Sequence, residues 1–136
     1  MHKFALHKNI YSSSKIQFYN LIIDGIDQFH AFEEGLETQY NSEFKSLASS
    51  ISQLCDNRNL PHGKRRKIRG LKKCVELISK NHRLYYIALP EHSLIICLGG
   101  TKKNQKKDIN KVKSLRKQLL KQIIDYGNLE IKPQIN

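Results

Sequence analysis

The sequence has few cysteines and no metal-binding pattern. Its three cysteines, Cys55, Cys74 and Cys97, are odd in number, lack close spacing and lie in apolar surroundings. We therefore expect buried free thiols rather than a disulfide framework. A CxxC pattern is absent, and the six histidines are scattered without HxH or HxxxH spacing. We expect no metal site and no cofactor.

Long hydrophobic runs are also missing. The longest, residues 84–89 and 94–98, are far too short to cross a bilayer. The chain does not open with the basic and apolar regions of a signal peptide. We expect a cytoplasmic protein without a membrane partner. Its 136 residues, 39% of them hydrophobic, suit one domain with a modest core.

Acidic residues are scarce in the middle and late chain. The sequence holds 24 Lys and Arg against 12 Asp and Glu, which gives a net charge of +12 and a pI of about 9.7. Residues 58–121 carry 19 of these basic residues and three acidic ones, whereas residues 1–57 are net negative. A merely soluble surface does not need this asymmetry. It indicates a polyanion partner, with nucleic acid ahead of an acidic membrane surface.

The first half of the chain predicts a strand followed by helix. Residues 1–15 show no clear period, and we expect an N-terminal extension outside the domain. Residues 16–23 predict a strand, and Asp27 can cap a helix. Gly35 allows a break with Asn41 capping a second helix, so one long helix and a helical hairpin both stay open. A solvated acidic face is expected from Glu33, Glu34, Glu37 and Glu43.

The second half predicts three strands and a helix. Residues 74–79, 82–89 and 93–98 are joined by short turns, which favours an antiparallel meander. The middle strand is apolar on both faces, so both faces should be covered. A helix is expected from about residue 105 to 126, with Gly127 as its C-cap and residues 127–136 as a loose tail.

The predicted fold is α+β. A single domain over residues 16–126 would pack an N-terminal helix or helical hairpin and a C-terminal helix against one antiparallel sheet. The link into the last helix suggests a phosphate site. Gly99 and Gly100 would let the backbone turn and expose its N–H groups. Lysines then crowd a helix start that already favours anions.

Three segments carry a family resemblance. They are Val75-Glu76-Leu77, then Asn81-His82-Arg83-Leu84-Tyr85, then the run from Leu98-Gly99-Gly100-Thr101 through Gln105 to Asp108-Ile109, with Lys67-Ile68-Arg69-Gly70 upstream. The order of elements with these segments resembles the RelE/ParE superfamily of toxins from bacterial type II toxin–antitoxin systems, within it the HigB-like (addiction module killer) branch. The resemblance covers about residues 67–117. The sequence departs from the family pattern at Ile78, at Asn81-His82 and at Thr101.

The resemblance implies an activity and partners. It implies a metal-independent endoribonuclease that cleaves mRNA on the ribosome by attack of the ribose 2′-hydroxyl on the adjacent phosphorus, which leaves a cyclic phosphate. It also implies a cognate antitoxin, often a helix-turn-helix protein. Two alternatives stay open, namely a ParE-like inhibitor of DNA gyrase and a catalytically inactive RNA-binding module of the same fold.

Such cleavage needs a base near the 2′-hydroxyl, cations on the phosphorane and an acid for the leaving oxygen. Arg83 is the first candidate, because a guanidinium on an apolar strand needs an anion, although Glu76 across the hairpin can equally be that anion and orient it. Lys102 and Gln105 are candidate phosphate ligands. His82 is a candidate base or acid.

Other residues are candidates for RNA binding without chemistry. Tyr85 shares a strand face with Arg83 and can either stack on a base or pack in the core. Backbone contacts are assigned to basic side chains, namely Lys67, Arg69, Lys72, Lys73, Lys103 and Lys106. The hypothesis requires that Arg83, Lys102 and Gln105 converge on one surface of the sheet.

Overall fold

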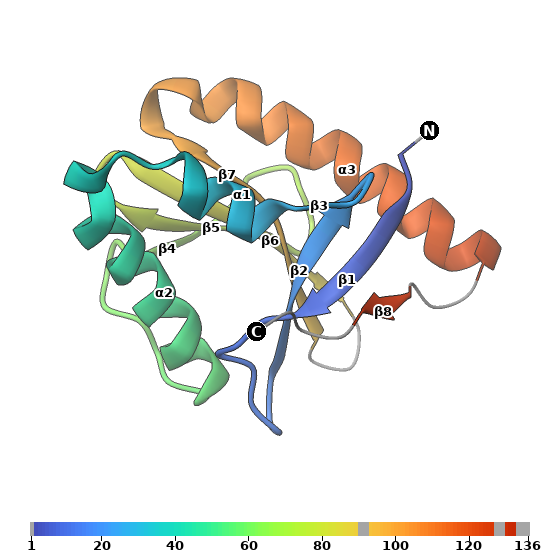
Figure 1. Cartoon of the computed structure of the whole chain (residues 1–136), viewed down its shortest axis with the longest axis horizontal. Helices are drawn as coiled ribbons and strands as arrows, with labels where there is room; N and C mark the ends of the chain where they lie inside the picture. Colours follow the sequence, from blue (N-terminus) through green and yellow to red (C-terminus); the bar gives the residue numbers. More distant parts are fainter. Residues whose placement is uncertain (1, 90–92, 127–129, 133–136) are drawn as a thin grey trace.

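One sheet with helices on both faces organises the computed structural model, which describes residues 2–89, 93–126 and 130–132 (Figure 1). The strands are β1 (Phe4–Lys8), β2 (Gln17–Ile23), β3 (Ile26–Asp27), β4 (Arg65–Lys67), β5 (Cys74–Ser79), β6 (His82–Leu89), β7 (Ser93–Thr101) and β8 (Ile131–Lys132). The helices are α1 (Gln28–Gly35), α2 (Asn41–Cys55) and α3 (Gln105–Tyr126), with short 3-10 turns η1 (Thr38–Tyr40) and η3 (Lys102–Asn104).

The sheet is mixed, so the prediction of a purely antiparallel sheet is wrong, whereas the α+β class is confirmed. Its order is β4-β5-β6-β7-β2-β1-β8, with β3 paired to β2 off this path. Strands β4 to β7 form the expected antiparallel meander. However, β7 runs parallel to β2, and β8 runs parallel to β1. Parallel pairing needs a long crossover, and the helices and meander between β2 and β7 provide one.

The N-terminal residues belong to the sheet, which differs from the predicted extension over residues 1–15. β1 pairs with β2 from Phe4 opposite Ile23 to Lys8 opposite Tyr19. Phe4, Ala5 and Leu6 are buried. An apolar run of three residues is too short to show a period, so no strand could be predicted there from the sequence alone. The expected tail enters the fold as well, because β8 lies within it, while Gly127 lies outside the described residues.

The helical region forms two separate helices, α1 and α2. Of the two predicted alternatives, the helical hairpin is therefore the one that the structure adopts. Asp27 caps α1 as predicted, because its Oδ1 accepts hydrogen bonds of 3.0 Å from the N–H groups of Phe29 and His30. Asn41 does not cap α2. It is the first helical residue, and the preceding cap position is held by Tyr40 without a side-chain hydrogen bond.

Both faces of the central strand β6 are covered, as its apolar pattern predicted. Leu84 and Tyr86 pack in a cluster with α2, while Tyr85 and Ile87 pack in a cluster with α3. Figure 1 shows α2 and α3 on different sides of the sheet. The three cysteines are free and buried, which confirms that prediction. No helix in the described ranges is both long and apolar enough to cross a membrane.

Phe4→Ala tests whether β1 is part of the folded core. The side chain is 5% exposed, and removing a buried phenyl ring should lower the free energy of unfolding by about 3–5 kcal/mol. Urea denaturation followed by circular dichroism measures this. Ile10→Ala, at a position 71% exposed, is the control and should change stability by no more than about 0.5 kcal/mol. Equal stability of the two variants would contradict the placement of β1.

Candidate nucleic-acid interface

Glu76, Arg83 and Gln105 come together on the face of the sheet that α3 covers. The fully buried Glu76 carboxylate accepts hydrogen bonds from Gln105 Nε2 at 2.8 and 3.0 Å and from Arg66 Nη2 at 2.8 Å. Arg83 Nε lies 3.5 Å from Glu76 Oε1. The sequence therefore identified three members of this cluster, including the ion pair across the hairpin. It missed Arg66, which stands opposite Glu76 on the neighbouring strand.

The Arg83 guanidinium is already bound by neighbouring protein groups in this arrangement. Its residue is 6% exposed, and Nη1 donates to the carbonyl oxygens of Lys80 at 2.7 Å and His82 at 3.0 Å. The exposed cation of the cluster is Arg66, whose side chain is 58% exposed. A phosphate could reach Arg83 only if these bonds rearranged. The cluster as it stands joins β4, β5, β6 and α3, and it neutralises one buried carboxylate with two guanidinium groups.

Tyr85 packs in the core, so of its two predicted roles the base-stacking one does not fit this geometry. The residue is fully buried, and burial together with the nearby Glu76 and Asp108 charges raises the pKa of its hydroxyl. Three buried polar atoms have no hydrogen-bond partner among the described residues. They are Arg83 Nε, Tyr85 Oη and Asp108 Oδ2.

The paired glycines serve close packing, which corrects the expectation that they turn the chain. Both lie inside β7, and neither has a positive φ. A Cβ on Gly99 would lie 2.3 Å from the ring of Phe32 in α1, and a Cβ on Gly100 would lie 2.0 Å from Asp108 Oδ2 in α3. The strand therefore needs glycine at both positions so that helices can approach its two faces.

His82 lies on the other face of the sheet from Arg83. Its Nδ1 is 3.0 Å from Glu43 Oε1, and its ring lies 4.7 Å from the Tyr40 ring. The expectation that Glu43 is solvated is wrong. The residue is 7% exposed and also accepts a 3.0 Å hydrogen bond from the Asn81 N–H. Because Glu43 stands in the first turn of α2, its carboxylate reaches the β5–β6 turn and holds helix and sheet together.

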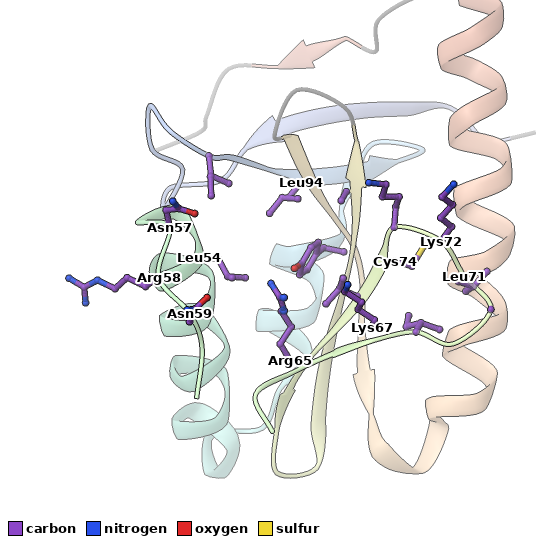
Figure 2. Close-up of a pocket in the computed structure, with 17 residues that line it drawn as sticks. Leu54, Asn57, Arg58, Asn59, Arg65, Lys67, Leu71, Lys72, Cys74 and Leu94 are labelled. Atoms are coloured by element: carbon purple, nitrogen blue, oxygen red, sulfur yellow. The ribbon is translucent and has the colours of Figure 1, made fainter. Parts of the chain in front are cut away.

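A basic hollow lies on the α2 side of the sheet, between the end of α2, β4 and the loop of residues 68–73 (Figure 2). Its volume is about 860 Å³, and none of the described residues that line it is acidic. The basic residues lining it are Arg58, Arg65, Lys67, Lys72 and Lys73. In Figure 2 the Arg58 side chain points away from the hollow, so it stands at the rim. Apolar lining residues include Leu54, Val75, Tyr86 and Leu94.

The loop of residues 68–73 is closed by its own backbone hydrogen bonds. Backbone hydrogen bonds run from Leu71 N to Ile68 O at 3.1 Å and from Ile68 N to Cys74 O at 3.0 Å. Gly70 and Lys73 take positive φ values of 81° and 67°, which close the loop tightly. Ile68 is buried in the core cluster. The loop lysines therefore extend from a fixed backbone, which lowers the entropy cost of binding an anion.

Three of the predicted RNA-binding residues meet in this hollow, namely Lys67, Lys72 and Lys73, and the sequence missed Arg58 and Arg65. The missed signal was the period-2 alternation of β4, which directs Arg65 and Lys67 to one face and Arg66 to the other. The remaining predicted cations do not line it. All of them are exposed: Arg69 lies on the 68–73 loop, Lys102 and Lys103 lie in η3, and Lys106 lies in α3.

Comparisons with protein-family models, with curated proteins and with solved structures find no match to this chain. Within the described ranges, no group of three or more His, Cys, Asp or Glu residues is placed to hold a metal ion. The arrangement can bind anions through the hollow.

Stability should depend on pH through Glu43. Burial tends to raise the pKa of its carboxyl, but the hydrogen bonds from His82 and Asn81 outweigh it and lower the pKa below the usual 4.5. The carboxylate therefore adds stability above pH 4.5 that is lost as the pH falls through the folded-state pKa. The difference in free energy of unfolding between wild type and Glu43→Gln should shrink as the pH falls below about 4.5, measured by urea denaturation.

Glu34→Gln is the matched control, because Glu34 is an exposed carboxylate of α1. Its difference from wild type should stay small throughout. A Glu43→Gln difference that does not change with pH would show that the carboxylate is not held by these hydrogen bonds.

Proposed function

We propose that the protein binds RNA and acts as the toxin of a type II toxin–antitoxin system, cleaving mRNA on the ribosome. The observation that carries the proposal is the basic hollow. Cations from the end of α2, from β4 and from the 68–73 loop converge there over an apolar floor, and none of the lining residues that the structure describes is acidic. Cations suit the phosphates of a nucleic acid, and an apolar floor suits its bases.

The catalytic part of the proposal rests on the resemblance to the RelE/ParE superfamily, because the Glu76 cluster lies on the α3 face of the sheet and the basic hollow lies on its α2 side. The segments that carry it supply Glu76, Arg83 and Gln105, and these side chains lie together. In the proposed reaction the 2′-hydroxyl gives its proton to water as its oxygen attacks phosphorus. The bond to the 5′-oxygen breaks and that oxygen takes up a proton from water, while cations near the start of α3 stabilise the phosphorane. His82 is separated from this cluster by the sheet, so we do not assign it the proton transfer.

The proposal includes partners and a location. An antitoxin, for which the resemblance suggests a helix-turn-helix protein, would cover the basic surface and hold the toxin inactive. Ribosomes with bound mRNA would be the target, which places the proposed activity in the cytoplasm.

A second candidate is a catalytically inactive RNA-binding module. The observation that favours it is the burial of Arg83, whose guanidinium is bound to two carbonyl oxygens and lies beside Glu76. Such a protein would keep the basic hollow and its affinity for RNA but would not cut the chain.

RNA binding should depend on the two outward cations of β4. Arg65→Gln with Lys67→Gln removes two exposed charges, and the plot of log affinity against log salt should become shallower by roughly 1.4 for a single-stranded RNA. Fluorescence anisotropy at several salt concentrations measures this. The control pair Lys3→Gln with Lys15→Gln removes the same charge from exposed sites of the acidic half. Equal slopes for the two pairs would refute binding in the hollow.

Cleavage is tested with purified protein, ribosomes and mRNA. Wild type should cut the mRNA, and Arg83→Ala should abolish cutting. Gln105→Ala is the companion variant, and we expect roughly 100-fold slower cleavage if Gln105 contacts the phosphorane. Because Arg83 and Gln105 both hold the buried Glu76 carboxylate, cleavage is compared at a temperature at which circular dichroism shows that each variant is folded. Gln118→Ala, another glutamine on α3, is the control and should cut normally.

The outcomes separate the candidates. Binding with a steep salt dependence but without cleavage or growth arrest would select the inactive module. Double-strand DNA breaks without RNA cleavage would select a gyrase inhibitor of the ParE kind.

A further inference from the structure

A second basic hollow lies on the other side of the 68–73 loop. Its volume is about 480 Å³. Its cations come from one helix, α3, and they are Lys113, Arg116, Lys117 and Lys121. The helix brings them together because spacings of three, four and eight residues fall on one face. Leu71 and Leu120 provide its apolar lining.

The two hollows adjoin, because Gly70 and Leu71 line both of them. The charge of Arg116 in the second hollow reaches the thiol of Cys74 in the first. Burial raises the pKa of that thiol, and Arg116 partly offsets the rise. Figure 2 shows Leu71 beside α3, with which it lines the second hollow. The 68–73 loop therefore contributes to both hollows and lies between them, and we call it the ridge.

The lysine side chains on the outer face of α3 repel one another when no anionic partner is bound. Lys113, Lys117 and Lys121 follow one another at intervals of four residues, and like charges at this spacing destabilise a helix. From residue 105 to 123 the sequence contains one acidic residue, Asp108, and it is buried. Solvation of a helix face does not require this exclusion of acidic residues. A polyanion lying across the face would relieve the repulsion.

We propose that the two hollows form one continuous track, in which a single RNA strand crosses the ridge and contacts both β4 and α3. The proposal rests on the proposed function for its ligand, since it takes RNA as the polyanion. It adds that the 68–73 loop lies under the strand, and that the site is longer than the first hollow alone.

Single-stranded RNA fits these features better than a duplex does. Both depressions are concave with apolar lining, which exposed bases can contact while their phosphates meet the surrounding cations. A duplex keeps its bases stacked inside and presents a rigid, convex phosphate surface. A flexible strand can also bend over the ridge.

The experiment compares short and long single-stranded oligonucleotides of one repeated sequence. The first-hollow variant is Arg65→Gln with Lys67→Gln. The second-hollow variant is Lys113→Gln, Lys117→Gln and Lys121→Gln, and the control replaces exposed Lys3, Lys15 and Lys45 by Gln. The second-hollow variant should weaken binding of the long oligonucleotide at least tenfold and reduce its salt slope by roughly 2. It should leave the shortest bound oligonucleotide unaffected, while the first-hollow variant weakens both.

The other outcomes overturn the track. Loss of affinity by the same factor at every length would mean a general charge effect, and no loss at any length would remove α3 from the site. If binding of an RNA duplex depends equally on the cations of both hollows, the ligand of the track is a duplex rather than a single strand. If an acidic polypeptide binds in a way that depends on the α3 lysines while RNA binding does not depend on them, α3 is assigned to a protein partner.

The two proposals fail differently. If wild type binds no RNA, the proposed function fails. If binding needs Arg65 and Lys67 but not the α3 lysines, the track alone fails. The second-hollow variant should fold, because the substitutions remove like-charge pairs, and its melting temperature is measured alongside.

Discussion

The buried carboxylate of Glu76 is the interaction on which the arrangement of the surface depends. It accepts hydrogen bonds from Arg66 of β4 and Gln105 of α3, and it lies beside Arg83 of β6. Removing one partner of such a buried set leaves an uncompensated charge, which is costly. Since β4 is a strand of three residues at the end of the sheet, its bond to Glu76 helps to hold it in place. The outward cations of β4 line the basic hollow from that position.

The alternation of side chains along β4 links stability to binding. Arg66 points to the Glu76 carboxylate on one face of the sheet, and its two neighbours, Arg65 and Lys67, line the hollow on the other. One short basic segment thereby serves two purposes, and the purpose of each residue follows from the face on which it lies. The basic composition of this segment is required partly by the fold and partly by the surface it presents.

Local patterns in the sequence predicted much of the fold. The meander of β5, β6 and β7, the long helix α3 and the capping of α1 by Asp27 all follow from periodicity and turn residues. The place of β1, the parallel pairing of β2 with β7 and the burial of Glu43 did not follow, because each depends on contacts between distant residues. The candidate site divides in the same way. The pair of Glu76 and Arg83 is local to a hairpin, whereas the hollow gathers segments that are separate in the sequence.

Gly99 and Gly100 determine how closely the helices on the two faces of the sheet can pack against β7. The missing side chain of Gly99 makes room for Phe32 of α1, and that of Gly100 makes room for Asp108 of α3. Consecutive positions of one strand thus govern the seating of helices on opposite sides. Bulk added at the first would loosen the N-terminal layer and spare the other, while bulk added at the second would lift the start of α3 and separate Gln105 from Glu76. Substitutions at these two neighbouring positions would therefore disturb different parts of the protein. One would displace the helix of the acidic half, and the other would displace the helix that carries the basic surface.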